Sequence, residues 1–418
     1  MKRETEVLVI GGGAIGICAA HYLRERDLRV TLIEKGEICS GSSYGNGGLI
    51  VPSHCVPLAA PGGVSKALRG MFDPESPFRV KPRLDLDLLA WLWKFRGACN
   101  RRHVQAAAPV LSALTLASLQ LYEELAARED LAFGFRKKGL LRVFNTRDGF
   151  ESGVDDARIL QSAGVETRTV NADEIGELEP NVRIRAVGGV FFPQDAHLIP
   201  VRFVLELARD AEKRGVEIHT STEVLGIETS GREITVVKTS RGDFSAREIV
   251  LAGGAWSPGI VRGLNLRLPI QPAKGYSITI KRPSPCPEIP ISFGEASAGL
   301  TPMGDTLRFA GTVELAGLDL SVDTRRVAAI LKAVPIYLPE LDPQKFELIE
   351  IWRGLRPFTP DGLPYLGRPR GYENLIVAAG HAMIGMSLAP ITGRLVSQLV
   401  AKENPELDLA LLNVDRYA

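Results

Sequence analysis

The sequence has few residues of the kinds that hold disulfides or metal ions, and their spacing does not group them. Its five cysteines form no C-x-x-C pair, and its six histidines form no H-E-x-x-H motif and no cluster with carboxylates. Structural zinc sites need such short spacings, and disulfide frameworks need paired cysteines in a small secreted chain. We therefore expect reduced thiols and no metal site.

Charge of one sign and long apolar runs are missing as well. Lys and Arg number 50 against 49 Asp and Glu, which leaves a net charge of +1 and no general basic field for nucleic acid. The apolar run before the first glycines is far shorter than the about 7–15 residues of a secretory signal, and no run approaches the about 20 that span a membrane. We expect a cytoplasmic protein whose only membrane contact would be peripheral, on the inner face of the cell membrane.

The order of the predicted elements indicates two interleaved domains. The chain has 418 residues, enough to bury about three quarters of its unfolded surface. A buried strand at residues 6–10, a helix after residue 16 and a second strand at 28–35 form a βαβ unit, which predicts a parallel sheet. Different elements follow, and a buried strand at 374–380 with a helix to residue 401 returns to the first type.

The glycine-rich turn after the first strand is typical of a dinucleotide site. In its G-x-G-x-x-G pattern Gly11 allows the tight turn, Gly13 admits a pyrophosphate and Gly16 lets helix and strand pack closely. The helix N-terminus offers N–H groups to phosphates, and Glu34, eighteen residues beyond Gly16, can accept hydrogen bonds from a ribose. The predicted cofactor contacts of this unit are Gly11, Gly13, Ala14, Ile15, Gly16, Glu34 and Lys35.

A second polar, glycine-dense segment at residues 40–49 favours a flavin over a nicotinamide. A buried flavin needs its pyrophosphate and ribityl chain covered, whereas a nicotinamide site has no evident need for a second phosphate-facing loop. A plain surface loop is the alternative. The predicted FAD contacts here are Ser42, Ser43, Asn46, Gly47, Gly48 and Leu49.

Motifs along nearly the whole chain resemble those of the FAD-dependent D-amino-acid oxidase superfamily, and most closely its bacterial D-amino-acid dehydrogenase branch. They are GGGAIG (11–16), SSYGNGG (42–48), LAAPG (58–62), GGVFFPQDAH (188–197), PAKGYSITI (272–280), WRGLRPFTPDGLPYLG (352–367) and NLIVAAGHAMIGMS (374–387). The resemblance implies an α/β fold: a GR2-type Rossmann FAD-binding domain interleaved with a substrate domain on a mixed, mostly antiparallel sheet. We expect the FAD-binding domain at 1–80, 198–262 and 350–418, and the substrate domain at 81–197 and 263–349.

Three side chains are candidates for the catalytic site. Arg356, in the motif GLRP, matches the arginine that holds the substrate carboxylate in similar oxidases, and a guanidinium fork suits that task; a structural salt bridge is the alternative. Tyr276 would contact the carboxylate or cover the site, or else belong to the core. His54 stands where relatives commonly have an active-site tyrosine, or else bonds only to backbone. Cys55 is the next residue, and a covalent bond between its sulfur and the flavin is a further hypothesis, which we do not favour.

The resemblance also assigns cofactor contacts late in the chain. Backbone N–H groups at the start of the last helix would face the flavin N1–C2=O edge, where negative charge gathers on reduction. His381 is expected to pack rather than act as a base. The residues assigned are Gly380, Met383, Gly385, Met386 and Ser387 for the ring, with Val224, Gly253 and Trp256 for the adenosine and pyrophosphate.

The expected reaction is hydride transfer from the Cα–H of a D-amino acid to flavin N5. The resulting imino acid hydrolyses to a 2-oxo acid and ammonia, and the electrons pass to a quinone or the respiratory chain, or in vitro to a dye. The alternative substrates are secondary amines, namely D-proline, hydroxyproline, sarcosine or an N-substituted glycine. Two rival classes remain, an NAD(P)-dependent dehydrogenase and a flavin subunit that needs partner chains; the oligomeric state is left open.

One apolar segment bears on the electron acceptor. Residues 88–96 combine tryptophans and leucines with Lys94 and Arg96, and two arginines follow at 101 and 102. Such a segment can rest in a membrane interface. The alternative is a helix packed against the substrate domain.

Overall fold

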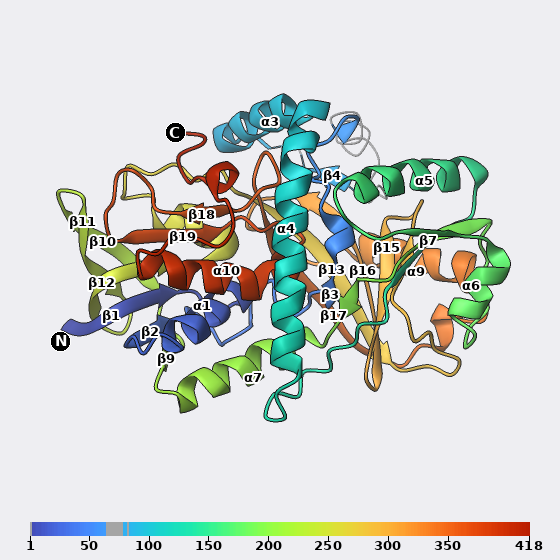
Figure 1. Cartoon of the computed structure of the whole chain (residues 1–418), viewed down its shortest axis with the longest axis horizontal. Helices are drawn as coiled ribbons and strands as arrows, with labels where there is room; N and C mark the ends of the chain where they lie inside the picture. The colour runs from blue at the N-terminus through green and yellow to red at the C-terminus, as the bar shows by residue number, and fades with distance from the viewer. Residues whose placement is uncertain (1, 64–77, 82) are drawn as a thin grey trace.

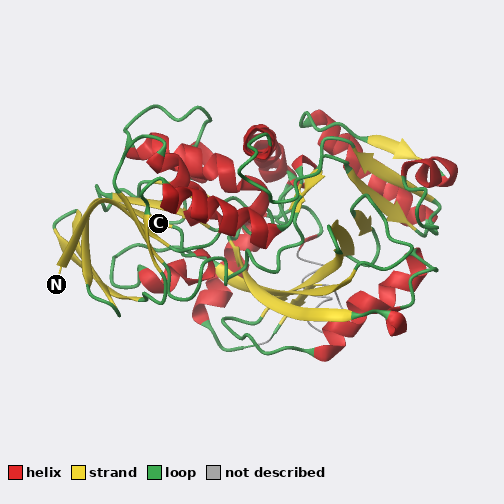
Figure 2. Ribbon diagram, turned by 90° about the horizontal axis from the view of Figure 1, so that it is seen from below, coloured by secondary structure: helices red, strands yellow, loops and turns green. Residues whose placement is uncertain are grey.

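The computed structural model describes residues 2–63, 78–81 and 83–418 (Figure 1). Residues 1 and 64–77 of the expected segment 1–80, and residue 82 of the expected segment 81–197, lie outside this part of the chain. In the view of Figure 2 the strands form two separate groups, one near the N-terminus and one at the other end of the molecule.

The first group is a largely parallel sheet built around the strand that precedes the glycine turn. β1 pairs in parallel with β2 on one side and β12 on the other; β9 extends the sheet beyond β2, and β19 lies parallel to β12. β18 and the β10–β11 hairpin add antiparallel edges. The strands are β1 (Lys2–Ile10), β2 (Val30–Ile33), β9 (Glu217–His219), β10 (Val224–Ser230), β11 (Glu233–Thr239), β12 (Asp243–Leu251), β18 (Tyr365–Gly367) and β19 (Leu375–Ala379).

Both faces of β1 are buried, which explains its unbroken apolar run. Val7 and Val9 pack into a core with the helices, whereas Leu8 and Ile10 pack into a second core on the other face. Alternate residues of a strand point to opposite faces, so a strand covered on both sides has to be apolar throughout. The helices α1 (Ala14–Arg24), α7 (Pro200–Lys213) and α10 (Gly385–Val400) lie on the first face (Figure 1).

The second group is a mixed, mostly antiparallel sheet, as the fold class predicted. Its strand order is β17-β13-β16-β15-β14-β5-β7-β6, and β4 pairs with β16. Only β14–β5 and β16–β4 are parallel pairs. The strands are β4 (Phe78–Val80), β5 (Leu140–Phe144), β6 (Arg168–Val170), β7 (Gly188–Phe192), β13 (Gln271–Lys281), β14 (Ile291–Phe293), β15 (Ala298–Met303), β16 (Thr306–Leu315) and β17 (Leu348–Phe358).

Helices and short connections complete the second half of the molecule. α5 (Arg147–Ser162), α6 (Ala172–Leu178) and α9 (Thr324–Tyr337) pack on this sheet, and α3 (Leu86–Ala98) covers its end near β4. A two-stranded ladder of β3 (Leu49–Ile50) and β8 (Ala196–His197) joins the loop after β2 to the segment after β7. The remaining short helices are η1 (Pro52–His54), η2 (Gly254–Trp256), α8 (Ser257–Ile260), η3 (Pro343–Lys345) and η4 (Ala410–Leu412).

Two expected domain boundaries differ from the strand pairing. The boundary at 349/350 cuts through β17, and all of β17 from residue 348 to 358 pairs with β13 of the second sheet. Residues 78–80, expected in the first domain, form β4 and pair with β16. Both strands are local continuations of the second sheet, so we propose boundaries before residue 78 and after residue 358.

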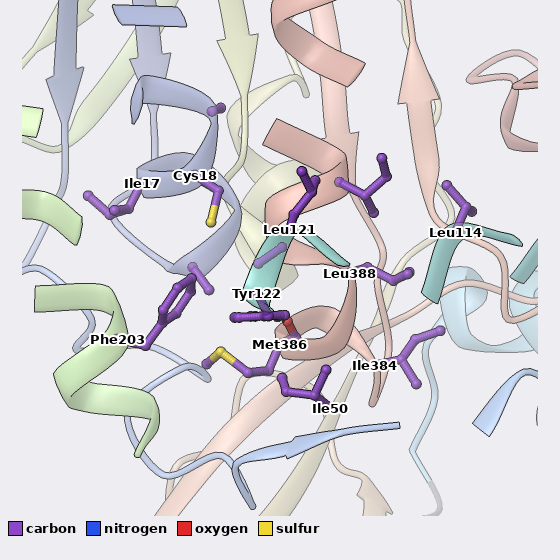
Figure 3. Packing of buried hydrophobic residues seen from close by; sticks show 14 of the residues in the cluster. Ile17, Cys18, Ile50, Leu114, Leu121, Tyr122, Phe203, Ile384, Met386 and Leu388 are labelled. Carbon is purple, nitrogen blue, oxygen red and sulfur yellow. Dashed lines mark hydrogen bonds between the residues drawn. The ribbon is translucent and has the colours of Figure 1, made fainter. Parts of the chain in front are cut away.

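Helix α4 (Arg101–Ala126) runs between the two sheets and joins the core of the first half (Figures 1 and 3). Figure 3 shows Tyr122 and Leu114 of α4 near Met386 and Leu388 of α10, and the Tyr122 hydroxyl donates to the Met386 carbonyl at 2.6 Å. Within the described residues, α4 alone is long and apolar enough to cross a membrane by length and composition, which the sequence analysis did not foresee. Of its most apolar window 56% is buried inside the protein, as in the core helix of a globular domain.

The crossing of α1 and α10 depends on a glycine. A Cβ at Gly393 would lie 2.5 Å from the backbone carbonyl of Cys18. Replacing Gly393 by Ala should therefore force the helices apart and lower the free energy of unfolding by about 1–3 kcal/mol. The thermal midpoint of the FAD-loaded protein measures this. Gly176→Ala is the matched control, because a Cβ there meets nothing within 4 Å and alanine is the better helix former; an equal loss in both variants would contradict the packing argument.

Candidate active site

One cavity of about 740 Å³ lies between the two sheets and contains most of the predicted site residues. Its size suits a large cofactor with a small substrate. The predicted cofactor residues that line it are Gly11, Gly13, Ala14, Ile15, Glu34, Lys35, Ser42, Ser43, Asn46, Gly47, Leu49, Val224, Gly253, Trp256, Met383, Gly385 and Met386. His54 and Arg356 line it as well.

The glycines of the first turn bring backbone against backbone. Gly11 has φ +117°, and a Cβ there would lie 2.5 Å from the carbonyl oxygen of Ala252 in the neighbouring strand connection. A Cβ at Gly16 would lie 1.8 Å from the Gly11 carbonyl oxygen, so this glycine permits the close packing of α1 and does not itself line the cavity. Because α1 begins here at the cavity wall, its free N–H groups form an anion-binding end.

Glu34 follows β2 directly, and its carboxylate holds the backbone of the neighbouring turns by two hydrogen bonds. One carboxylate oxygen accepts from the backbone N–H of Gly12 at 2.7 Å, and the other accepts from Gly36 at 2.8 Å. Each oxygen retains a second lone pair, so the carboxylate can still accept hydrogen bonds from ribose hydroxyls in the cavity. Close by, the ammonium of Lys35 lies 3.7 Å from the centre of the Trp256 ring.

The loop 40–49 is anchored to both sheets. Ser43 Oγ accepts from the N–H of Ala14 at 3.0 Å, and Ser42 Oγ donates to the carbonyl of Leu355 in β17. Arg308 of β16 donates to the carbonyls of Tyr44 and Asn46, each at 3.0 Å. Arg308 was not among the predicted site residues, although an arginine between the apolar residues of the segment TLRFAG (306–311) is a signal that it serves an internal partner.

One end of the cavity is formed by one face of β17. Alternation places Trp352, Gly354 and Arg356 on the same face, and both large side chains line the cavity. The Arg356 guanidinium crosses the neighbouring strand at Gly275, where a Cβ would lie 1.9 Å from Nη1. Trp352 was missed; the alternation of the WRGLR segment around Arg356 could have identified it.

Arg356 has no carboxylate partner among the described residues. Its Nη1 donates to the carbonyl of Thr312 at 2.9 Å, which leaves most of its five donors free. Burial lowers the pKa of the guanidinium to about 10, so it stays charged at neutral pH. A buried, unneutralised cation is unfavourable on its own, and an anionic ligand would relieve that cost. The structural salt bridge considered from the sequence is not formed.

Tyr276 does not lie where the sequence analysis expected it. It pairs with Arg353 in the strand register, which puts its side chain on the face of β13 away from the cavity. Its hydroxyl donates to the Ser321 carbonyl at 3.4 Å and accepts from the Asp323 N–H at 3.1 Å. Lys274, on the same face, donates to Asp319 at 3.1 Å. Tyr276 therefore does not line the cavity, which favours the alternative that it belongs to the core, and its contact with a substrate stays a prediction.

Tyr276 and Lys274 instead hold the loop 316–323 that closes one side of the cavity. Leu320 of this loop lines the cavity, and its carbonyl accepts from Nε of Arg353 at 3.0 Å. Side chains on the outer face of β13 and β17 thus hold the loop that carries Leu320, and Leu320 lines the cavity on the inner face.

Four predicted cofactor residues are not part of the cavity lining: Gly16, Gly48, Gly380 and Ser387. Gly48 and Gly380 adopt positive φ, at +71° and +82°, and a Cβ would meet the carbonyl of Leu198 at Gly48 and the side chain of Thr359 at Gly380. Ser387 Oγ accepts from Val51 N and donates to the Leu49 carbonyl, both at 3.1 Å. These residues contact other parts of the chain next to the cavity wall, and their assignment as direct cofactor contacts stays a prediction.

The other candidates near the cavity are neutral. Burial lowers the pKa of His54 to about 3 and that of His381 to about 3, so both imidazoles are uncharged. His381 Nε2 lies 3.0 Å from the hydroxyl of Thr392, which fits the packing role expected for it. Burial raises the pKa of the Cys55 thiol to about 11, which keeps the thiol protonated and disfavours attachment of a flavin there.

The sequence from residue 6 to 399 matches the family model of FAD-dependent oxidoreductases of the DAO type. The chain belongs to this family. It is similar to the D-amino acid dehydrogenases of Vibrio atlanticus, at 31% identity over 99% of this chain and 100% of the relative, and of Granulibacter bethesdensis, at 32% identity over 99% of each.

Solved structures with the same fold accompany these relatives. Glycine oxidase from Geobacillus kaustophilus aligns with a TM-score of 0.80 at 25% identity over 100% of both chains. L-proline dehydrogenase from P. horikoshii aligns with a TM-score of 0.77 at 22% identity over 100% of this chain and 98% of the other. The second likeness concerns the fold alone.

The cavity of this family member fits the FAD on which the family depends. The glycine cradle of the first turn, the exposed start of α1 and the carboxylate of Glu34 suit a pyrophosphate with its adenosine ribose. The start of α10 suits the flavin ring, because Gly385 and Met386 line the cavity there. The part of FAD that each residue contacts stays a prediction.

Removing the Glu34 carboxylate should weaken FAD binding. Glu34→Ala removes the acceptors of two backbone N–H groups as well as the predicted ribose partner, and we expect the Kd for FAD to rise about 10- to 100-fold. Titration of the apoprotein with FAD, followed by flavin fluorescence, measures this. Glu37→Ala is the control, since Glu37 is exposed on the same connection; equal affinities in all three proteins would remove Glu34 from the site.

Proposed function

We propose that the chain is an FAD-dependent dehydrogenase that converts D-amino acids through an imino acid to 2-oxo acids and ammonia. The observation that carries this is the charged guanidinium of Arg356, which lines the cavity that fits FAD and has no carboxylate partner among the described residues. A free guanidinium fork beside a flavin site selects a small carboxylate. The names of the relatives support an amino-acid substrate of D configuration.

In the proposed reaction the protein mainly holds the substrate in position, and few of its side chains take part in the chemistry. FAD, when bound, supplies the hydride acceptor for the substrate Cα–H. Arg356 holds the carboxylate by two hydrogen bonds and so fixes the rotation of the amino acid. Trp352 and Leu320 line the same end of the cavity and limit the space for the side chain. Orientation of this kind converts an encounter into a near-attack arrangement.

Replacing Arg356 by Ala should abolish productive substrate binding but not cofactor binding. We expect KM for the preferred D-amino acid to rise about 10- to 100-fold, the cost of a charge-assisted pair, while the FAD content stays unchanged. Steady-state kinetics with an artificial dye and the absorbance of bound flavin measure the two effects. Arg147→Ala is the control, because it removes the same charge from an exposed position on α5, where the side chain pairs with Glu151 and does not line the cavity. Unchanged kinetics for Arg356→Ala would take the arginine out of its role.

Anaerobic bleaching of the flavin by an amino-acid panel tests the activity itself. D-alanine should bleach the protein, whereas D-proline, hydroxyproline, L-proline and sarcosine test the alternative of a secondary-amine substrate. Bleaching by the secondary amines alone would replace the proposal by that alternative. Slow return of the colour in air would identify a dehydrogenase.

For the electron acceptor we infer a quinone or the respiratory chain, reached by peripheral membrane contact. The supporting feature is one face of α3, which lies at the edge of the molecule (Figure 1). Leu86, Leu89 and Trp93 are 83%, 54% and 72% exposed, while Leu88, Trp91 and Phe95 of the same helix are buried. The basic residues Lys94 and Arg96 lie in the same helix, close in sequence to Trp93. Apolar side chains flanked by basic ones suit an anionic interface.

Making this face polar should weaken membrane binding. Each buried apolar side chain is worth about 1.5–3 kcal/mol, so the double variant Leu89→Ser, Trp93→Ser should bind anionic phospholipid vesicles at least about 10-fold more weakly. Co-sedimentation measures the binding. Leu225→Ser is the control, since Leu225 is 67% exposed on β10 of the other sheet. If the parent protein does not sediment with vesicles, the membrane contact is refuted.

A further inference from the structure

A hydrogen-bonded series leads from the cavity to a fully buried carboxylate. His54 lines the cavity, and its Nδ1 lies 3.1 Å from Ser53 Oγ. Ser53 Oγ donates to one oxygen of Asp195 at 2.5 Å, and Ser53 N donates to the other at 3.2 Å. Asp195 is 0% exposed. We call the series Asp195–Ser53–His54 the relay.

The hydrogen bonds fix the proton positions within the relay. A serine hydroxyl has one proton, and Ser53 gives it to the Asp195 carboxylate, so toward His54 it can only accept. The proton of the neutral imidazole is then on Nδ1, and Nε2 carries a lone pair. Among the described residues Nε2 has no hydrogen-bond partner, so its lone pair is available to a ligand in the cavity.

His54 and Arg356 belong to the same wall. Ala382 and Met383 line the cavity and also the small recess next to His54. The N–H of Ala382 donates to the carbonyl of Pro357 at 3.0 Å, directly beside Arg356. Ala382 and Met383 thus connect the part of the wall at Arg356 with the part at His54, and the amine of an amino acid held by Arg356 would lie on this side of the cavity.

We propose that the relay takes up the proton that the substrate ammonium must lose before hydride transfer. The inference rests on the proposed function, because it concerns the amine of an amino acid bound at Arg356. The ammonium gives one proton to Nε2, Nδ1 gives its proton to Ser53 Oγ, and the Ser53 hydroxyl proton passes to Asp195. The amine regains its lone pair, Asp195 becomes a neutral acid, and the proton returns to water by the same route after product release.

The surroundings of Asp195 favour this transfer. Burial raises the pKa of Asp195 to about 7, although its hydrogen bonds with Ser53 and the charge of Arg142 on β5 oppose the shift. Arg142 in turn faces Asp156 of α5, and the Cys55 thiol beside η1 stays protonated. Since an ammonium and a carboxylate become two neutral groups, the transfer also removes charge from a site poor in water.

The test compares the parent holoenzyme with Asp195→Asn in anaerobic rapid mixing with the D-amino acid that bleaches the parent. Asn keeps the shape and can bond to Ser53 but cannot take a proton. At pH 7 we expect flavin reduction about 100-fold slower in the variant. The deficit should disappear as the pH rises through the pKa of the substrate ammonium, because the amine then arrives with its lone pair free.

A second variant and a second readout guard against mere loss of structure. Ser53→Ala breaks the relay but keeps Asp195, and it should show the same alkaline rescue; Ser118→Ala, a buried serine of α4, should show no deficit. Infrared difference spectra on substrate binding should show the carbonyl band of a protonated carboxylic acid in the parent and not in Asp195→Asn. A deficit in both relay variants that is equal at every pH would overturn the relay, as would a missing band. If no amino acid bleaches the parent, the proposed function itself fails.

Discussion

The cavity depends on the clamping of residues 40–49 between the two sheets. This loop leaves the first sheet after β2, and Arg308 of the second sheet holds its carbonyls while Ser43 holds the start of α1. The β3–β8 ladder fixes the end of the loop against the segment after β7. Without these contacts the parallel sheet would still keep the core on its other face, which contains Leu8 and Ile10 and no described residue of the second sheet. The two walls of the cavity would have no fixed separation, and neither Arg356 nor His54 would face a defined cofactor position.

The parts of the site that the sequence could predict are local in the chain. The turn at Gly11, the helix after it and the carboxylate of Glu34 lie within thirty residues, and their spacing alone defines a dinucleotide unit. Arg356 could be placed at the cavity because it sits in a short motif, and its role as carboxylate anchor, taken from the resemblance, stays a prediction. Fold class followed from the same motifs and from the alternation of element types.

The parts that the sequence could not predict depend on contacts between distant residues. Tyr276 was misplaced because β13 is buried on both faces for ten successive residues, so its pattern does not tell which side faces the cavity. Asp195 joins Ser53 across 142 positions, and Arg308 joins Asn46 across 262. The expected boundary at 349/350 differs from the one that we propose after residue 358, because β17 begins exposed and ends in the core, so its composition changes in the middle of one strand.

Strand β13 does two different tasks on its two faces, and this has a consequence for how the enzyme can be altered. Gly275 leaves room on the inner face for the carboxylate anchor, whereas Lys274 and Tyr276 fix the covering loop from the outer face. In the proposed function, recognition of the invariant part of an amino acid is thus separated from control of its variable part by the thickness of a single strand. Substrate range can therefore evolve, or be engineered, by changing the outer face and the loop 316–323, while the anchor and the flavin wall keep their sequence.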